Sequence, residues 1–168
     1  MKKNIDLEGE EQYIILRCAH GDLAYAQKCL VKASLTDDKF ISHCLVSMSV
    51  LAYCRPFTDC RMPIGPKRIL LKKSDVPRGH RILHEKMMIA RNKLIAHADL
   101  EVREPKLHAW THVKPFMFPI QFKTLDLHEW LGKDAPIADL INSLMEIIAI
   151  RIKHIEEKFE LQLREMFS

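Results

Sequence analysis

The stretch that decides the fold runs from Asp134 to Met166, DAPIADLINSLMEIIAIRIKHIEEKFELQLREM. Its apolar residues recur every three or four positions, which is the period of one side of an α-helix. They are Ile137, Leu140, Ile141, Leu144, Ile147, Ile148, Ile155 and Phe159. The second half, from Arg151 to Arg164, is heavily charged. We therefore expect a long helix that extends beyond a helical bundle or supports a partner chain.

Two more helices are expected at the start of the chain. The first spans residues 8–33, and Gly21 weakens it by roughly 1 kcal/mol relative to Ala. The second starts at Thr36-Asp37-Asp38, where a hydroxyl that can cap the helix is followed by acids in the first turn. It ends near residues 53–55, because Pro56 disfavours a helical residue before it. The periodic apolar positions of the first helix are Ile15, Ala19, Leu23, Ala26, Leu30 and Ala33, and the predicted buried face of the second is Phe40, Ile41, Cys44, Leu45, Met48 and Leu51.

A further helix is predicted from Ser74 or Asp75 to about Ala98, with Pro77 in its first turn. Its buried positions step by three and four residues: Leu83, Met87, Ala90, Leu94 and Ala98. A long loop over residues 55–76 precedes it, and prolines exclude a long helix from residues 99–133. We expect a short hairpin or an irregular arm there. The fold class is thus all-α, an antiparallel four-helix bundle in a single domain of residues 1–168.

The composition indicates a soluble cytoplasmic protein. Hydrophobic residues make up 48% and charged residues 29% of the chain, and only 5 residues are Gly, which favours helices. The five cysteines form no CxxC pair, so we expect free buried thiols in a reducing compartment and no zinc site. The basic N-terminus lacks the apolar run of a signal peptide. No membrane segment was expected from the sequence.

Positive charge gathers between Arg55 and Arg81. This segment has eight Lys and Arg residues against two Asp, a net +6, although the whole chain carries only +4. Such a patch points weakly to a polyanion such as RNA, and an ordinary solvated loop is the equal alternative. The candidate RNA-binding residues are Arg55, Lys67, Arg68, Lys72 and Lys73.

The segment from Ala90 to Asp99, ARNKLIAHAD, is the one stretch that argues for a specific chemistry. A histidine can take a proton from a ribose 2′-hydroxyl or give one to a leaving oxygen. An arginine can grip a phosphate at two points and stabilise charge in the transition state. No close acidic pair is evident to carry Mg²⁺. Arg91 and His97 therefore suit metal-free cleavage of RNA, which supplies its own nucleophile.

Arg91 and His97 cannot meet on one regular helix. At about 100° per residue, each lies about 60° from the buried position Leu94, on opposite sides. Six residues also separate them by roughly 9 Å along the axis. A two-fold axis near this helix would bring two arginines and two histidines together, so we expect a site shared across a homodimer. The ordinary alternative is a pair of surface residues in local ion pairs, such as Lys93 with Asp99.

The run Arg91-Asn92-Lys93-x-x-Ala96-His97-x-Asp99 resembles the signature of the HEPN superfamily, in the form seen in its abortive-infection branch. In that family an Arg and a following polar residue precede a His by four to six intervening residues, and here five intervene. Residues 53–57, YCRPF, are similar to the same branch. The specific match covers about nine residues and the order of the helices.

The resemblance implies a helical homodimer with the motif helices at its interface. It also implies metal-independent RNase activity, often as a toxin or phage-defence component with an antitoxin partner, and no cofactor. By this analogy Arg91 and His97 are the catalytic pair and Asn92 supports them. Lys93, Asp99 and His84 are added as supporting candidates from their places beside the motif, since the family assigns them no role. A metal site at His108 and His112 is not expected between prolines.

Two other functions remain open from the sequence. One is a non-catalytic helical module that binds nucleotide, RNA or a partner protein through the same cleft and the basic loop. Such a module predicts salt-sensitive binding without turnover. The other is a purely structural role, in which Arg91 and His97 are paired locally and point away from any interface.

Overall fold

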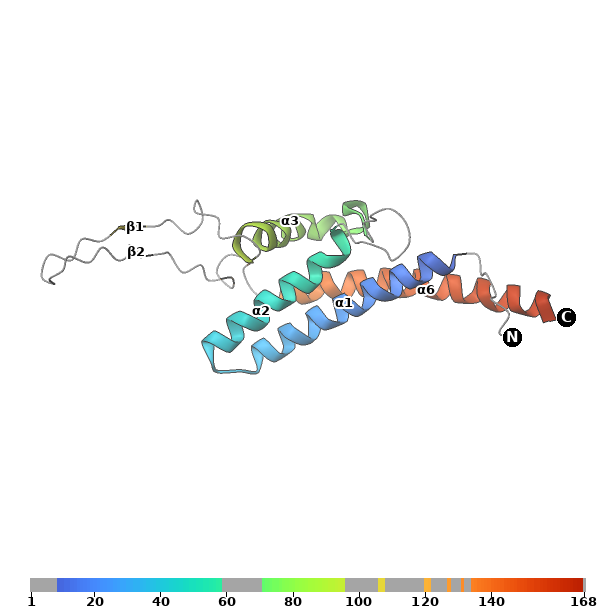
Figure 1. Ribbon diagram of the computed structural model, residues 1–168, viewed down its shortest axis with the longest axis horizontal. Coiled ribbons are helices and arrows are strands. Elements are labelled where there is room, and N and C mark those ends of the chain that lie inside the picture. The colour runs from blue at the N-terminus through green and yellow to red at the C-terminus, as the bar shows by residue number, and fades with distance from the viewer. Residues whose placement is uncertain are drawn as a thin grey trace, which may run out of the picture.

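The computed structural model of the chain describes residues 9–58, 71–95, 106–107, 120–121, 127, 131 and 134–167. The protein is all-α in this part. Its long helices are α1 (Glu10–Ser34), α2 (Lys39–Cys54) and α6 (Asp134–Phe167). The shorter α3 (Arg81–Ile89) follows α2 in the chain. Figure 1 shows α1 and α6 running in opposite directions, with α2 returning along α1 and the C-terminal end of α6 extending past the start of α1.

Helix α1 confirms its sequence pattern. It buries Ala19, Leu23, Ala26, Leu30 and Ala33 as predicted, and Leu16 is buried where Ile15 was expected. Gly21 does not interrupt the helix, and its Cα faces open space. The residue before the helix is Gly9, whose φ of 88° lies in the left-handed region that glycine adopts without strain.

Helix α2 ends where the sequence predicted, but its N-cap is Asp38 and not the Thr36 hydroxyl that was expected to cap it. Oδ1 of Asp38 accepts hydrogen bonds from the backbone N–H groups of Phe40 and Ile41, at 2.8 and 3.1 Å. These bonds satisfy donors that the first turn of a helix leaves free. The helix ends at Cys54, and Pro56 lies in the short 3-10 helix η1 (Arg55–Phe57) that follows. Pro56 thus stops α2 where it was expected to.

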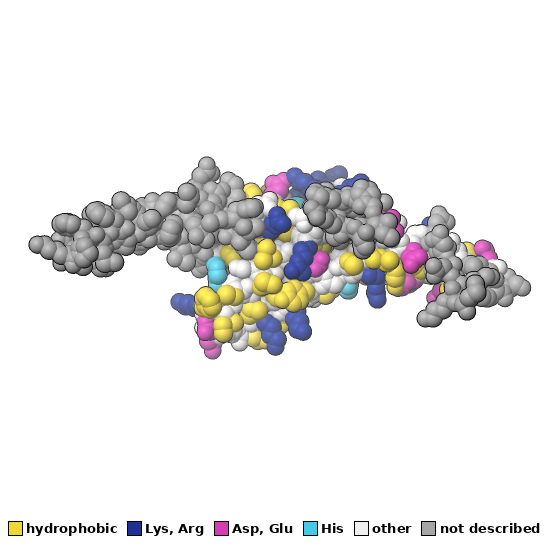
Figure 2. Space-filling view, viewed as in Figure 1, with side chains coloured by type: hydrophobic (Ala, Val, Ile, Leu, Met, Phe, Trp, Pro, Cys, Tyr) yellow, Lys and Arg dark blue, Asp and Glu magenta, His cyan; other side chains and the backbone are white. Residues whose placement is uncertain are grey.

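The predicted buried face of α2 is wrong. The helix buries Val46, Ser49, Val50 and residues 52–54, whereas Phe40 is 76% exposed and Ile41 and Cys44 are also exposed. Leu45, Met48 and Leu51 are half-buried. Helix α2 is apolar on nearly every side, so its periodicity does not say which side meets α1. Figure 2 shows hydrophobic side chains on the visible surface where α1 and α2 lie.

The helix that carries the motif begins later and ends differently than the sequence predicted. Two 3-10 turns, η2 (Lys73–Asp75) and η3 (Arg78–His80), come before α3 starts at Arg81. Regular helix stops at Ile89, and residues Ala90–Ile95 form a π-helix, η4. The expected cap at Ser74 or Asp75 therefore caps no long helix. Of the predicted stripe, Met87 and Ala90 are buried and Leu83 is half-buried.

Helix α6 completes the core, as its pattern predicted. Ile137, Leu140, Ile141, Leu144, Ile148 and Ile155 are buried, and Ile152 joins them. The Tyr13 hydroxyl donates to Glu156 at 2.9 Å, and Gln27 donates to Asn142, so polar contacts tie α1 to α6 along much of its length. Between α3 and α6, two-residue strands β1 (Lys106–Leu107) and β2 (Ile120–Gln121) pair antiparallel. This pair fits the predicted short hairpin.

The expectations of buried free thiols and of no membrane segment are only partly met. Cys29 and Cys54 are buried free thiols, but Cys18 and Cys44 are exposed, and Cys60 lies outside the described residues. Residues Lys39–Phe57 are long and apolar enough to cross a membrane, with 44% of the apolar window buried inside the fold. This stretch was not predicted from the sequence. A single partly buried helix of this kind is common in the core of soluble proteins and is weak evidence for a membrane.

Candidate functional site

Arg91 and Asn92 lie in the π-helical turn that follows α3. The Arg91 guanidinium donates a hydrogen bond from Nη1 to Oδ1 of Asn92 at 2.7 Å. Arg91 is half-buried and Asn92 is exposed. The asparagine therefore fixes one edge of the guanidinium, and among the described residues no second hydrogen-bond partner of this guanidinium is found. Lys93 lies in the same turn.

The π-helical turn changes the geometry expected for the motif. In a π-helix the backbone hydrogen bonds reach the fifth residue, so each residue advances by a smaller angle than in an α-helix. The estimate that Arg91 and His97 flank Leu94 at equal angles assumed regular helix, and regular helix ends at Ile89. That estimate is therefore invalid from Ala90 onward. π-helical turns are rare and are frequent at functional sites.

The junction between α3 and η4 is held against the end of α2. The Cys54 thiol lies 3.6 Å from the Met87 carbonyl oxygen, to which it donates, and the Ala90 N–H reaches the carbonyls of both Lys86 and Met87. Burial raises the pKa of the Cys54 thiol to about 12, while the positive charge of Arg91 acts to lower it. The Cys54 thiol is thus protonated at neutral pH and donates a hydrogen bond to α3 close to the point where the π-helix begins.

His84 lies in the core, one element before the motif. It is 5% exposed, and its Nδ1 lies 2.9 Å from the hydroxyl oxygen of Tyr53. The rings of Tyr53 and Phe57 contact it edge-on, with centroids 5.9 and 4.6 Å away. We call Tyr53, Phe57 and His84 the aromatic cluster. His84 was expected beside the motif as a supporting residue. In the structure it belongs to α3 and packs against α2 and η1.

The charge state of His84 follows from its surroundings. Burial lowers its pKa below the ordinary value, Lys73 lowers it further, and Glu85 acts in the opposite direction. Lys73 pairs with Glu85 at the surface above the cluster. His84 is therefore neutral at pH 7, with one ring nitrogen held by Tyr53.

The predicted RNA-binding residues are partly engaged in ion pairs. Nη1 of Arg55 lies 3.1 Å from Oδ1 of Asp22, and Lys73 pairs with Glu85. Both cations keep more than half of their side-chain surface exposed, so they remain accessible to a polyanion. Lys72 is exposed, and its backbone N–H donates to Asp75. Nothing in these contacts gathers the three cations into one groove.

Several predicted site residues lie outside the described residues: His97, Asp99, Lys67 and Arg68. The structure therefore describes one half of the proposed catalytic pair. Across the ranges that it does describe, no three His, Cys, Asp or Glu side chains gather as metal ligands do.

Sequence reasoning missed the contacts that hold α3 against the end of α2. Tyr53 and Cys54 were quoted for their resemblance to a family pattern, and their side chains turn out to hold α3. The available signal was the spacing of Val46, Val50 and Tyr53, which defines an apolar stripe on the side of α2 opposite to the one chosen.

No protein-family model, curated protein or solved structure matches this chain.

Proposed function

We propose that the chain is a metal-independent RNA-cleaving protein of the HEPN type, acting as a homodimer. The observation that carries the proposal is the π-helical turn Ala90–Ile95, in which Asn92 orients the guanidinium of Arg91 at 2.7 Å. An arginine held in this way is suited to grip a phosphodiester. The all-α architecture supports the finer proposal of a four-helix bundle.

The proposed chemistry uses two residues. His97 takes the proton of a ribose 2′-hydroxyl, whose oxygen attacks the neighbouring phosphorus, and the bond from phosphorus to the 5′-oxygen breaks as that oxygen takes a proton from water. Arg91 stabilises the negative charge that grows on the phosphate oxygens. The products are a 2′,3′-cyclic phosphate and a 5′-hydroxyl end. Asn92 positions Arg91, and Lys93, Asp99 and His84 remain supporting candidates.

The direct test is cleavage of RNA by the purified chain in EDTA, with the product ends identified. We expect cyclic phosphate ends. His97→Ala and Arg91→Ala should each lower the rate by about 100-fold or more, because each removes a group needed in the transition state. Lys86→Ala, which removes an exposed cation from α3, is the matched control and should cleave normally. Full activity of His97→Ala would overturn the proposal.

A mixing experiment tests whether the site is shared between two chains. If Arg91 of one chain works with His97 of the other, a mixed dimer of Arg91→Ala and His97→Ala chains has one complete site and one empty site. Random exchange of subunits then restores roughly a quarter of the normal rate. No recovery in a verified mixed dimer would contradict the shared site.

The second candidate is a non-catalytic module that binds RNA or nucleotide. The exposed charges of Arg55 and Lys73 favour it, since they allow binding without any catalytic pair. The same assay separates the two functions. Salt-sensitive RNA binding with no cleavage in any preparation would support the module. A role as a toxin with an antitoxin partner, in the cytoplasm, follows only if cleavage is found.

A further inference from the structure

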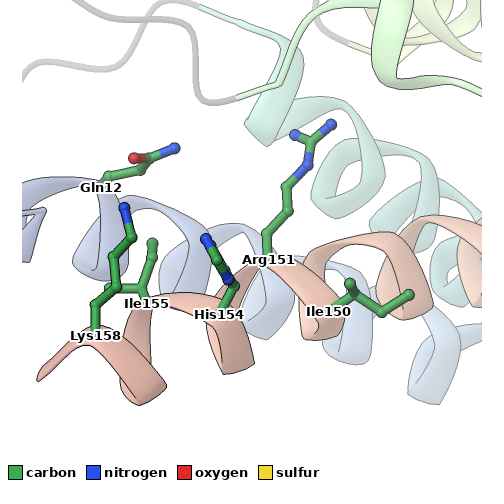
Figure 3. Close-up of a pocket in the computed structure, with 6 residues that line it drawn as sticks. All are labelled: Gln12, Ile150, Arg151, His154, Ile155 and Lys158. Carbon is green, nitrogen blue, oxygen red and sulfur yellow. The ribbon is translucent and has the colours of Figure 1, made fainter. Parts of the chain in front are cut away.

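A pocket lies between the first turn of α1 and the second half of α6, on elements that carry none of the motif. It has a volume of about 310 Å³ and is open to solvent on one side. Figure 3 labels its lining residues, which are Gln12 of α1 and Ile150, Arg151, His154, Ile155 and Lys158 of α6. Sites for small ligands start at roughly this size, near 300 Å³.

Three of the lining residues, Arg151, His154 and Lys158, have basic side chains, and one of them, Arg151, is paired with an acid. Elsewhere on this half of α6 the cations are paired: Lys153 with Glu157 at 4.0 Å, and Arg164 with Glu160 at 3.9 Å. Among the described residues, Lys158 and His154 have no acidic partner. They are four positions apart, so they lie on the same side of the helix one turn from each other.

Arg151 continues this row one turn earlier. Its Nη2 lies 2.6 Å from Oδ1 of Asp75, which ties α6 to η2 and fixes the side chain. Hydrogen bonds from Arg151 and from the backbone of Lys72 hold the pKa of Asp75 below its usual value, against the opposing effect of burial. In Figure 3, Arg151, His154 and Lys158 project to the same side of α6, with Gln12 beyond them.

The floor and rim of the pocket are apolar. Ile155 is buried beneath the charged row, whereas Ile150 is 71% exposed at the rim. Exposing the apolar side chain of Ile150 to water is unfavourable, so a ligand that covers it gains binding free energy. The pocket thus matches a ligand with an anionic end and an apolar body.

We propose that this pocket binds a small organic phosphate monoester. A monoester presents three terminal oxygens and about two negative charges near neutral pH. Lys158, Arg151 and a ring N–H of His154 supply donors to these oxygens, and the Gln12 amide can donate one more. The apolar body then covers Ile150. The pocket contains neither Arg91 nor His97, so this proposal can be tested separately from the proposed RNA cleavage.

The test is a titration of the full chain with phenyl phosphate, followed by NMR of the Ile150 methyl and His154 ring signals. We expect saturable shifts of both signals, with a dissociation constant near or below 1 mM. Lys158→Ala should weaken binding roughly tenfold, because it removes a charge-assisted hydrogen bond. Lys153→Ala is the matched control, since it removes a cation of the same helix outside the pocket.

Three comparison ligands make the result decisive. Inorganic phosphate should bind more weakly than phenyl phosphate, because it lacks the apolar body, and phenol should not bind. Benzoate should also bind more weakly, because it offers two oxygens and one charge. The proposal is overturned if phenyl phosphate gives no saturable shift at 10 mM. It is equally overturned if Lys158→Ala and Lys153→Ala behave alike, or if benzoate binds as tightly.

Discussion

Helix α3 and the π-helical turn η4 are consecutive in the chain, yet they treat their polar residues in opposite ways. In α3, His84 is packed against Tyr53 and Phe57 and takes part in the core. In η4, Arg91 is half-buried and bonded to the exposed Asn92. One helical unit therefore divides into a part that uses a polar side chain for stability and a part that presents one to solvent.

The difference teaches which polar residues of the motif region are available for chemistry. A buried histidine with a satisfied nitrogen contributes to the fold, and removing its partner costs stability. An arginine held at one edge by an amide keeps donors for a ligand. Substitutions in the aromatic cluster should change the free energy of unfolding, whereas substitutions at Arg91 should change RNA cleavage or binding.

The largest effect on stability is expected from Tyr53→Phe. It removes the hydroxyl that lies 2.9 Å from Nδ1 of His84 and leaves a buried ring nitrogen without that partner. The free energy of unfolding should fall by about 1–3 kcal/mol. Urea denaturation followed by circular dichroism measures it.

Tyr25→Phe is the matched control for this substitution. Tyr25 lies on α1 and is 46% exposed, so loss of its hydroxyl should change stability by less than about 0.5 kcal/mol. RNA cleavage or binding by folded Tyr53→Phe should be normal. If that variant loses its RNA function while still folded, the aromatic cluster and η4 are coupled, and the division between them fails.

A smaller effect is expected from pH, through His84. Burial lowers the pKa of His84 in the fold, and unfolding returns it to about 6.5. Below that pH the unfolded chain binds more protons than the folded chain, so stability falls as the pH drops from about 6.5 toward 5. His84→Gln should remove this part of the pH dependence.

Denaturation at pH 5.0 and pH 7.0 measures the effect. His20→Gln, which replaces a half-buried histidine of α1 outside the cluster, serves as the control for replacing a histidine by glutamine. A His84→Gln chain that loses as much stability between these two pH values as the unchanged chain would contradict the assignment.

The smallest effect is expected from Glu85→Gln. It breaks the pair with Lys73, whose side chain is 60% exposed against 53% for Glu85. Such an exposed pair contributes little to stability, because water and salt screen it. Because Glu85 acts to raise the pKa of His84, the substitution should also make the acid loss of stability slightly larger. Denaturation at the same two pH values tests both statements, and a loss of stability at pH 7 as large as that of Tyr53→Phe would contradict the first.

Features with one strong local cause were predictable from the sequence. The stop at Pro56 acts within a few residues and was found as expected, and the start of α2 was found near the predicted place with Asp38 as its cap in place of Thr36. The amphipathic pattern of α6 leaves one apolar side for the core, and its buried residues were largely predicted. Helix α1 was predictable for the same reason.

Features that depend on tertiary contacts were not predictable. Helix α2 is apolar on nearly every side, so only its contact with α1 decides that Val50 is buried and Phe40 exposed. The π-helical turn contains no Gly or Pro from which it could be predicted. The Cys54 thiol that donates to the Met87 carbonyl comes from another helix. Burial of His84 likewise depends on Tyr53, 31 positions away.

The distance in sequence between α1 and α6 has a consequence for synthesis. Tyr13 and its partner Glu156 are separated by 143 positions. At about 5–20 residues per second, a ribosome needs on the order of ten seconds to add this stretch. During that interval Leu23 and the rest of the inner side of α1 can be covered by α2 but not by α6. The nascent hairpin thus presents an apolar surface to chaperones until the ribosome delivers α6.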